Sequence, residues 1–206
     1  MRIAVSVQFN EAFREVKDIT FPVLEEYCER HGYEIILTWI DEPKRSIIWD
    51  RYSIIAENLK DYDYIVHMDC DVLITNLSIR LEEFCQGPIV IAQCLTESGE
   101  KRFNDGVAFF KNCFSTHGIL RDIQEMPDDD FVKCGQDALE VIWRTCPYLF
   151  RIERQKAINA MPFAKYGMPE GWLGNWSEGD FVLHLPGMRN DVRCQIFREI
   201  LPKVLR

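Results

Sequence analysis

The chain has 206 residues, of which 47% are hydrophobic and 28% charged, and this composition is typical of a globular protein with one sizeable core. We therefore predict a single domain over residues 1–206. The formal net charge of −9 argues against a non-specific binder of nucleic acid or of an anionic membrane, but a bound cation would still permit a nucleotide-sized substrate.

The first third of the chain alternates between strand and helix patterns. A helix capped by Thr20 is predicted to run to Arg30, and a second is predicted after a cap at Ser46. The three predicted strands, which are short and rich in apolar residues, cover Arg2–Gln8, Glu34–Trp39 and Tyr64–Met68. This alternation indicates an α/β fold with a mostly parallel, doubly wound sheet, whose ligands bind beyond the carboxyl ends of the strands.

The pattern is weaker in the rest of the chain. Residues 147–180 are rich in Pro, Gly, Asn and aromatic residues, so we predict loops there. The remaining predicted elements are strands over Pro88–Gln93, Gly106–Lys111 and Asp180–Leu185, and helices over Asp137–Arg144 and 190–201.

Asp69 and Asp71 follow the third predicted strand and are separated by Cys70. Side chains alternate along a strand, so the two carboxylates are expected on the same side. They would repel each other unless a positive group binds, and paired carboxylates are ligands that a divalent cation prefers. The alternative is a loop with two solvated acids, which does not explain the apolar Val72–Ile74 that follows.

His184 ends an apolar strand and precedes Pro186 and Gly187. A lone histidine on such a strand is usually a hydrogen-bonded core residue, but imidazole also suits manganese-like ions beside carboxylates. We therefore predict His184 as a third metal ligand. The other histidines, for which we predict structural roles, are His31, His67 and His117.

Two further polar segments are candidates for substrate contacts. Asn104-Asp105-Gly106 is either an ordinary turn or a place where the backbone approaches a substrate. Gln136-Asp137 opens a helix, where an acid is also favoured by the helix dipole. Aromatic side chains among the late glycines offer either packing or a ligand face, namely Tyr166, Trp172 and Trp176.

The eight cysteines form no Cys-x-x-Cys pair, so no zinc ribbon or thioredoxin-type motif is present, and most are expected to be reduced. No apolar run has the length of a membrane span, and the first residues lack a signal-peptide pattern. These features predict a soluble, cytoplasmic protein.

Taken together, these segments resemble the GT-A glycosyltransferases, and most closely the galactosyl-, mannosyl- and xylosyltransferases of family 34. The Asp-x-Asp motif alone is weakly specific, whereas its combination with a closing Gly-Asp-Phe-Val-x-His-x-x-Gly block is more specific. The blocks that carry the resemblance occur in order at 27–33, 49–51, 64–76, 104–106, 136–139, Asn159 and 179–187.

The resemblance implies a UDP-sugar or related nucleotide-sugar donor held through Mn²⁺ or Mg²⁺, a glycan or glycoprotein acceptor, and retention of the anomeric configuration. It implies Asp69, Asp71 and His184 as metal ligands, and Asp137, Gln136 and Asp105 as catalytic candidates. The implied donor-binding set is Ser6, Val7, Gln8, Arg51, Asp69, Cys70, Asn104, Gly106, Gly187 and Arg189, with Arg193 as a further candidate for the diphosphate. Members of this family are typically anchored in the Golgi membrane through a stem, and no such segment is recognisable here.

Three alternatives remain open from the sequence. A nucleotide-sugar hydrolase would use the same site with water as the acceptor. A metal-dependent phosphatase of the HAD type also places Asp-x-Asp after an apolar strand, but usually on the first strand, whereas two βα units precede it here. A non-catalytic glycan-binding module would bind glycans without turning over any donor.

Overall fold

A computed structural model describes residues 1–95, 101–127, 132, 134–162 and 174–204. In this part of the chain a six-stranded sheet has the order β2-β1-β3-β6-β5-β7. The strands are β1 (Ile3–Phe9), β2 (Glu34–Trp39), β3 (Tyr64–Met68), β5 (Ile89–Leu95), β6 (Lys101–Lys111) and β7 (Phe150–Arg154). Neighbours are parallel except at β6, which is antiparallel to both β3 and β5. This mixed, mostly parallel sheet confirms the predicted fold class.

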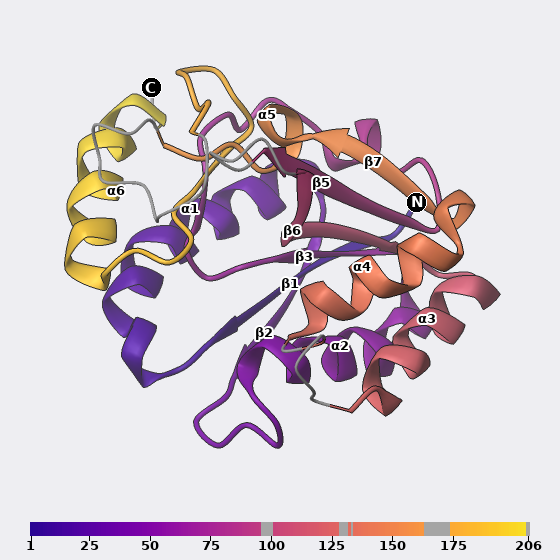
Figure 1. The fold of residues 1–206 in the computed structure, drawn as a ribbon. Coiled ribbons are helices and arrows are strands. Elements are labelled where there is room, and N and C mark those ends of the chain that lie inside the picture. The colour runs from indigo at the N-terminus through magenta and orange to yellow at the C-terminus, as the bar shows by residue number, and fades with distance from the viewer. Residues whose placement is uncertain (96–100, 128–131, 133, 163–173, 205–206) are drawn as a thin grey trace.

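Helices cover both faces of the sheet (Figure 1). On one face α1 (Arg14–His31) packs beside α6 (Asn190–Val204), together with a small antiparallel sheet of β4 (Val72–Ile74) and β8 (Val182–His184). The opposite face carries α2 (Ile47–Asn58), α3 (Phe114–Glu125) and α4 (Gly135–Thr145). The short α5 spans Gln155–Ile158, and 3₁₀ turns occupy Glu11–Phe13, Leu59–Asp61, Leu81–Glu83 and Pro147–Leu149.

The alternation of side chains along the central strands creates a core on each face. In β1, Ile3, Val5, Val7 and Phe9 face α1, whereas Ala4 faces α2. In β3, Val66 and Met68 face α1, and Ile65 faces α2. Because β1, β2, β3, β5 and β7 all run in the same direction, their carboxyl ends meet at one edge, where ligands bind in open α/β sheets.

The first helix corrects a prediction. It begins at Arg14 rather than after Thr20, whose hydroxyl donates to the Val16 carbonyl within the helix at 3.1 Å. Thr20 and Pro22 are typical of a helix start, but burial of Val16 against the sheet favours the earlier turn. The predicted end is confirmed by Gly32, whose φ of 73° is the left-handed conformation that glycine adopts readily.

Two other predictions needed correction. β7 and α5 occupy part of 147–180, where we expected only loops, because residues of β7 extend the sheet beside β5. Asn104-Asp105-Gly106 is not a turn before a strand but lies inside β6. The predicted strands Glu34–Trp39 and Tyr64–Met68 have the predicted bounds, and the other predicted elements are present with shifted ends.

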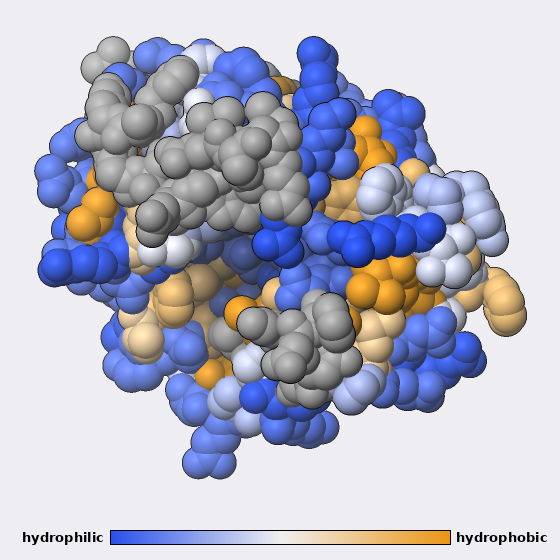
Figure 2. Space-filling view, viewed as in Figure 1, coloured by the Kyte–Doolittle hydropathy of each residue, from blue (hydrophilic) through white to orange (hydrophobic). Residues whose placement is uncertain are grey.

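None of the described helices is both long enough and apolar enough to cross a membrane. Hydrophilic side chains cover much of the described surface on the face shown in Figure 2, interrupted by separate apolar patches. All eight cysteines are free thiols.

Candidate active site

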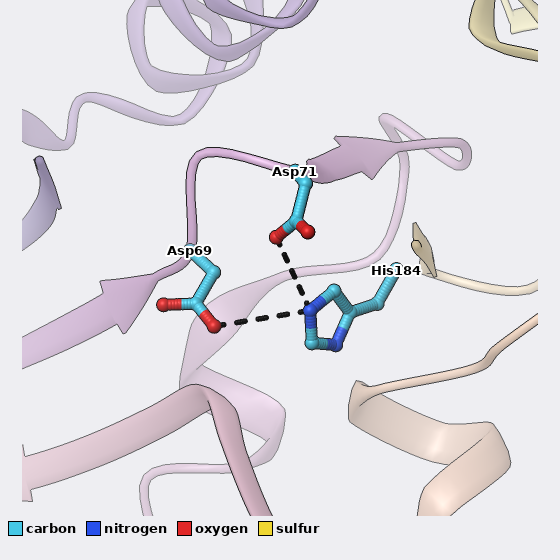
Figure 3. Close-up of side chains that lie close together, drawn as sticks. All are labelled: Asp69, Asp71 and His184. Atoms are coloured by element: carbon cyan, nitrogen blue, oxygen red, sulfur yellow. Dashed lines mark ion pairs between the residues drawn. The ribbon is translucent and has the colours of Figure 1, made fainter. Parts of the chain in front are cut away.

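Three predicted metal ligands converge at the edge of the sheet (Figure 3). Asp69 follows β3, Asp71 precedes β4, and His184 ends β8. His184 Nε2 lies 3.3 Å from Asp71 Oδ1 and 3.8 Å from Asp69 Oδ2. One ligand atom from each residue lies within 4.8 Å of the others. The cause is strand pairing, since β4 and β8 are antiparallel with Val72 opposite His184.

One oxygen of each carboxylate is restrained by an arginine. Asp69 Oδ1 accepts from Arg51 Nη1 at 2.8 Å, and His67 Nε2 lies 2.9 Å from the same oxygen. Asp71 Oδ2 pairs with Arg193 Nη2 at 2.8 Å. The remaining oxygens, Asp69 Oδ2 and Asp71 Oδ1, are the ones that face His184. Each carboxylate therefore presents one oxygen to the centre of the cluster.

His184 completes the cluster with a nitrogen that has no partner. Its side chain is 1% exposed, and its Nε2 accepts or donates no hydrogen bond among the described residues. Its Nδ1 lies 2.7 Å from Asn159 Oδ1. A buried polar atom without a hydrogen-bond partner costs free energy. A positive ion at the point where the three ligand atoms converge would offset this cost.

Arg51, one of the predicted donor-binding residues, is held by two carboxylates. Its side chain extends from α2, on the face of the sheet that α2 covers, and is almost fully buried. It pairs with Asp105 Oδ2 at 2.5 Å and also with Asp69. The Tyr52 hydroxyl donates to the same Asp105 oxygen. Burial alone would lower the pKa of Arg51, but the charges of Asp105 and Asp69 outweigh it and raise that pKa, so the guanidinium stays charged.

The electrostatics of Asp69 follow from these contacts. Burial would raise the pKa of its carboxyl, but the charge of Arg51 and the hydrogen bond to His67 outweigh burial and hold the pKa well below its usual range. Asp69 is therefore an anion at neutral pH, which is the state that a cation binds. Between the two carboxylates, burial raises the pKa of the Cys70 thiol well above its ordinary value.

A bulge in β6 brings Asn104, Asp105 and Gly106 to the site. Ile91 of β5 pairs with Ala108, but the next residue, Ala92, pairs with Asn104, so residues 105–107 bulge out of the β5 pairing. The Gly106 carbonyl accepts from the Asp69 amide at 2.7 Å. A Cβ on Gly106 would lie 2.2 Å from His184 Cε1, so only glycine leaves space for the imidazole.

A cavity of about 300 Å³ adjoins the two aspartates. It lies at the carboxyl ends of β1 and β3, where Gln8 Nε2 donates to Ser6 Oγ at 2.7 Å. Val7, between them, packs in the core against α1. The lining consists of Gln8, Phe13, Ile48, Arg51, His67, Asp69, Cys70 and Asp71. Four members of the predicted donor-binding set, Gln8, Arg51, Asp69 and Cys70, therefore share one cavity.

A larger cavity of about 660 Å³ lies elsewhere, between α5, the 3₁₀ turn Leu81–Glu83 and the segment before β8. It shares no lining residue with the cavity beside the aspartates.

Several predicted residues have described contacts away from the cluster. Asp137 and Gln136 lie in the first turn of α4, and Asp137 pairs with Arg102 at 3.1 Å. Arg189 is exposed and pairs with Asp191 at 2.8 Å, beyond Gly187. Their catalytic and donor-binding roles stay predictions. Trp176 donates from its indole to Thr75 at 3.2 Å, and Tyr166 and Trp172 lie outside the described residues.

His67 is a site residue that the sequence reasoning missed. We predicted a structural role, but it contacts both Arg51 and Asp69 and lines the cavity. Its position two residues before Asp69, on the same face of β3, is the signal that could have identified it. Asn159 was part of the resemblance but carried no predicted role. His31 and His117 bond to Leu77 and Asn112, away from the cluster.

Part of the chain matches a known family, and the fold is similar to solved structures. Residues 23–112 match the model of the galactosyl transferase GMA12/MNN10 family. The fold is similar to that of a glycosyltransferase involved in the glycosylation of the major capsid of PBCV-1, with a TM-score of 0.74 and 16% identity over 97% of this chain and 100% of that one. The search of curated protein sequences gives no significant match.

Two further solved structures are similar at lower TM-scores. The galactosyltransferase LgtC, in complex with donor and acceptor sugar analogs, gives 0.63 with 13% identity, over 98% of this chain and 96% of that one. The glycosyltransferase GlyE of Streptococcus pneumoniae TIGR4 gives 0.52 with 14% identity, over 76% of this chain and 46% of that one.

At these identities the structural neighbours establish the fold, which is that of the GT-A glycosyltransferases. The family match is independent of them and covers α2, β3 and the two aspartates. The resemblance to family 34 is thereby confirmed, and the chain is a glycosyltransferase with the GT-A fold that matches the galactosyl transferase GMA12/MNN10 family over residues 23–112.

Proposed function

We propose that this glycosyltransferase moves a hexose or pentose from a nucleotide-sugar, bound in the cavity beside Asp69, to a hydroxyl of a glycan or glycoprotein. The donor is a UDP-sugar, a divalent cation is required, and the anomeric configuration is retained. One observation carries this proposal: the unpartnered His184 Nε2 faces two carboxylate oxygens beside a cavity lined by Gln8 and Arg51.

Asp69, Asp71 and His184 would hold the cation. Two carboxylate oxygens and one imidazole nitrogen suit Mn²⁺, and Mg²⁺ would use the oxygens. When bound, the cation would supply positive charge to the departing diphosphate. The restrained geometry of the two aspartates favours this use, because neither carboxylate needs to turn before it binds.

The remaining residues of the site bind and orient the donor. The cavity beside Asp69 has about 300 Å³, within the range of small-ligand pockets, and we assign it to the nucleotide with Gln8 at the base. Asn104 and Gly106 on the β6 bulge, with Gln136 and Asp137 on α4, would line the donor sugar. Arg51 and Arg193 act through the aspartates they restrain. LgtC, a galactosyltransferase seen with donor and acceptor sugar analogs, supports a hexose donor.

Retention places the acceptor hydroxyl on the face that the diphosphate leaves. No strong nucleophile is needed there if the acceptor oxygen forms its bond to the anomeric carbon as the sugar–phosphate bond breaks, and its proton passes to the departing diphosphate. Asp105 accepts hydrogen bonds from Arg51 and Tyr52, so we assign it to positioning these groups. Asp137 and Gln136 stay our catalytic candidates.

A substitution tests this proposal. We expect Asp71→Ala to abolish Mn²⁺-dependent transfer while the protein stays folded, because one cation ligand is lost. Asp122→Ala is the control, since Asp122 is an exposed acid on α3 whose described ion pair is with Arg121. Transfer is measured from UDP- and GDP-sugars to a glycan panel, after a thermal-shift screen of the same donors with and without Mn²⁺. Full activity of Asp71→Ala in the presence of Mn²⁺ would refute the proposal.

The same assays address the alternatives, none of which the family match favours. A hydrolase would release free sugar at the same rate with and without a glycan acceptor. A glycan-binding module would bind glycans without any donor turnover. A phosphatase would form a phosphorylated Asp69, which mass spectrometry of the trapped protein would detect.

A further inference from the structure

Two buried amides connect His184 to the bulge in β6. Asn159, which follows α5, is fully buried, and its Nδ2 donates to the carbonyl oxygen of Asn104 at 3.1 Å and to Asn104 Oδ1 at 2.5 Å. Its Oδ1 lies 2.7 Å from His184 Nδ1. The three side chains come from β6, from the end of α5 and from β8, so this connection is a product of the fold.

The hydrogen-bond directions in this chain follow from a backbone group. The Gly106 amide can only donate, and it does so to Asn104 Oδ1 at 3.0 Å. Asn104 therefore presents its oxygen, which requires that Asn159 present its NH₂ group. The Asn159 oxygen must then face His184, and an oxygen there accepts only if His184 Nδ1 carries a hydrogen.

This order of donors decides which nitrogen of His184 is free. In a neutral imidazole with hydrogen on Nδ1, Nε2 keeps its lone pair. Nε2 has no hydrogen bond to any described residue, and it faces Asp69 and Asp71. The opposite tautomer would place a lone pair of Nδ1 against the Asn159 oxygen, which is repulsive. The backbone of His184 is also held beside Asn159, because the His184 amide donates to the Ala160 carbonyl at 2.8 Å.

We propose that Asn159 is a positioning residue that holds His184 as the Nδ1–H tautomer and so sets the affinity of the site for a divalent cation. The inference rests on the proposed function for the identity of the bound ion, but the tautomer itself does not. Asn159 touches neither the cation nor the donor in this assignment; it acts through His184, with Asn104 fixing the orientation of its amide.

The test combines two measurements on metal-free protein prepared with a chelator. Long-range ¹H–¹⁵N spectra at about pH 8 distinguish the two neutral tautomers, and the His184 signals are assigned by their loss in His184→Gln. Calorimetric titration with Mn²⁺ alone then gives the cation affinity. In the wild type we expect the Nδ1–H tautomer of His184 and measurable binding of Mn²⁺.

Asn159→Leu removes the amide and keeps the branching of the side chain. We expect a loss of the Nδ1–H preference and a fall in Mn²⁺ affinity of about 10- to 100-fold, as is usual when the partner of a ligating histidine is removed. Asn159→Asp keeps an acceptor for Nδ1–H, so it should retain the tautomer and lose less affinity than Asn159→Leu. The matched control is Asn112→Leu, since Asn112 Oδ1 lies 2.9 Å from His117 Nε2 on the surface, and its Mn²⁺ affinity should equal that of the wild type.

The outcomes separate the two proposals. A His184 signal of the Nε2–H type in the metal-free wild type, or an Asn159→Leu protein that is folded and binds Mn²⁺ as tightly as the wild type, would overturn the role of Asn159. Wild-type protein with the Nδ1–H tautomer that binds no Mn²⁺ would overturn the metal site and the affinity role while leaving the tautomer assignment supported. If Asn159→Leu does not fold, the wild-type spectrum and Asn159→Asp decide the question.

Discussion

Removing the Arg51 guanidinium should destabilise the protein even without a bound cation. Arg51 and Asp105 form an ion pair at 2.5 Å in which both side chains are only 6% exposed. Removing one partner of a buried pair costs about 3–5 kcal/mol, because the other charge stays buried without compensation. Asp69 is 31% exposed and keeps its contact with His67, so we count only the Asp105 pair.

We expect Arg51→Ala to lower the free energy of unfolding by about 3 kcal/mol, near the lower end of this range, because the Tyr52 hydroxyl still donates to Asp105. For a chain of this length, that corresponds to a fall in melting temperature of about 6–12 °C. Arg51→Lys should give a smaller fall, since it keeps a charge but loses the fork that reaches both carboxylates.

Urea unfolding of chelator-treated protein measures this cost, with Arg30→Ala as the control. Arg30 pairs with Glu26 on α1 at 2.7 Å, but the two side chains are 48% and 44% exposed, so its loss should cost less than about 1 kcal/mol. If the free energies of unfolding of Arg51→Ala and Arg30→Ala agree within about 0.5 kcal/mol, the buried ion pair does not stabilise the site as we argue.

Two further predictions concern glycines and thiols. Gly135→Ala should lower the free energy of unfolding by about 1–3 kcal/mol, because the new Cβ would lie 2.0 Å from the Tyr52 ring. Gly118→Ala is the matched control, since its Cβ has open space, and it should raise the free energy of unfolding by up to about 1 kcal/mol. Urea unfolding measures both, and equal effects of the two substitutions would contradict the packing around Gly135. In the folded protein at about pH 8, iodoacetamide should modify Cys113 faster than Cys28, as followed by peptide mass spectrometry. Partial burial would raise the pKa of the Cys113 thiol, but hydrogen bonds with neighbouring hydroxyls outweigh burial and lower that pKa. Burial raises the pKa of the Cys28 thiol to about 12. Labelling of Cys28 and Cys113 at equal rates would contradict this difference in reactivity.

The parts of the fold that the sequence predicted are those with a local cause. The β1, β2 and β3 strands are short apolar runs, and the alternation with helices indicates a mostly parallel sheet without knowledge of any contact. β7 was not predicted, because Phe150–Arg154 carries charged residues and extends an edge of the sheet, so its structure depends on pairing with β5 rather than on its own pattern.

The same distinction applies to the site. Asp69 and Asp71 can be recognised together, because one strand sets their spacing, and His184 can be added from the apolar strand that it ends and the Pro and Gly that follow. The groups that restrain these ligands have no such signal: Arg51 reaches Asp69 from α2, and Asn159 at the end of α5 reaches His184 of β8. Their residue types are also ambiguous in a sequence, since a buried arginine beside two carboxylates reads the same as one free to meet a phosphate. Sequence patterns therefore identify the atoms that could bind a cation, whereas the tautomer and the orientation that make those atoms available depend on contacts that only the folded chain creates.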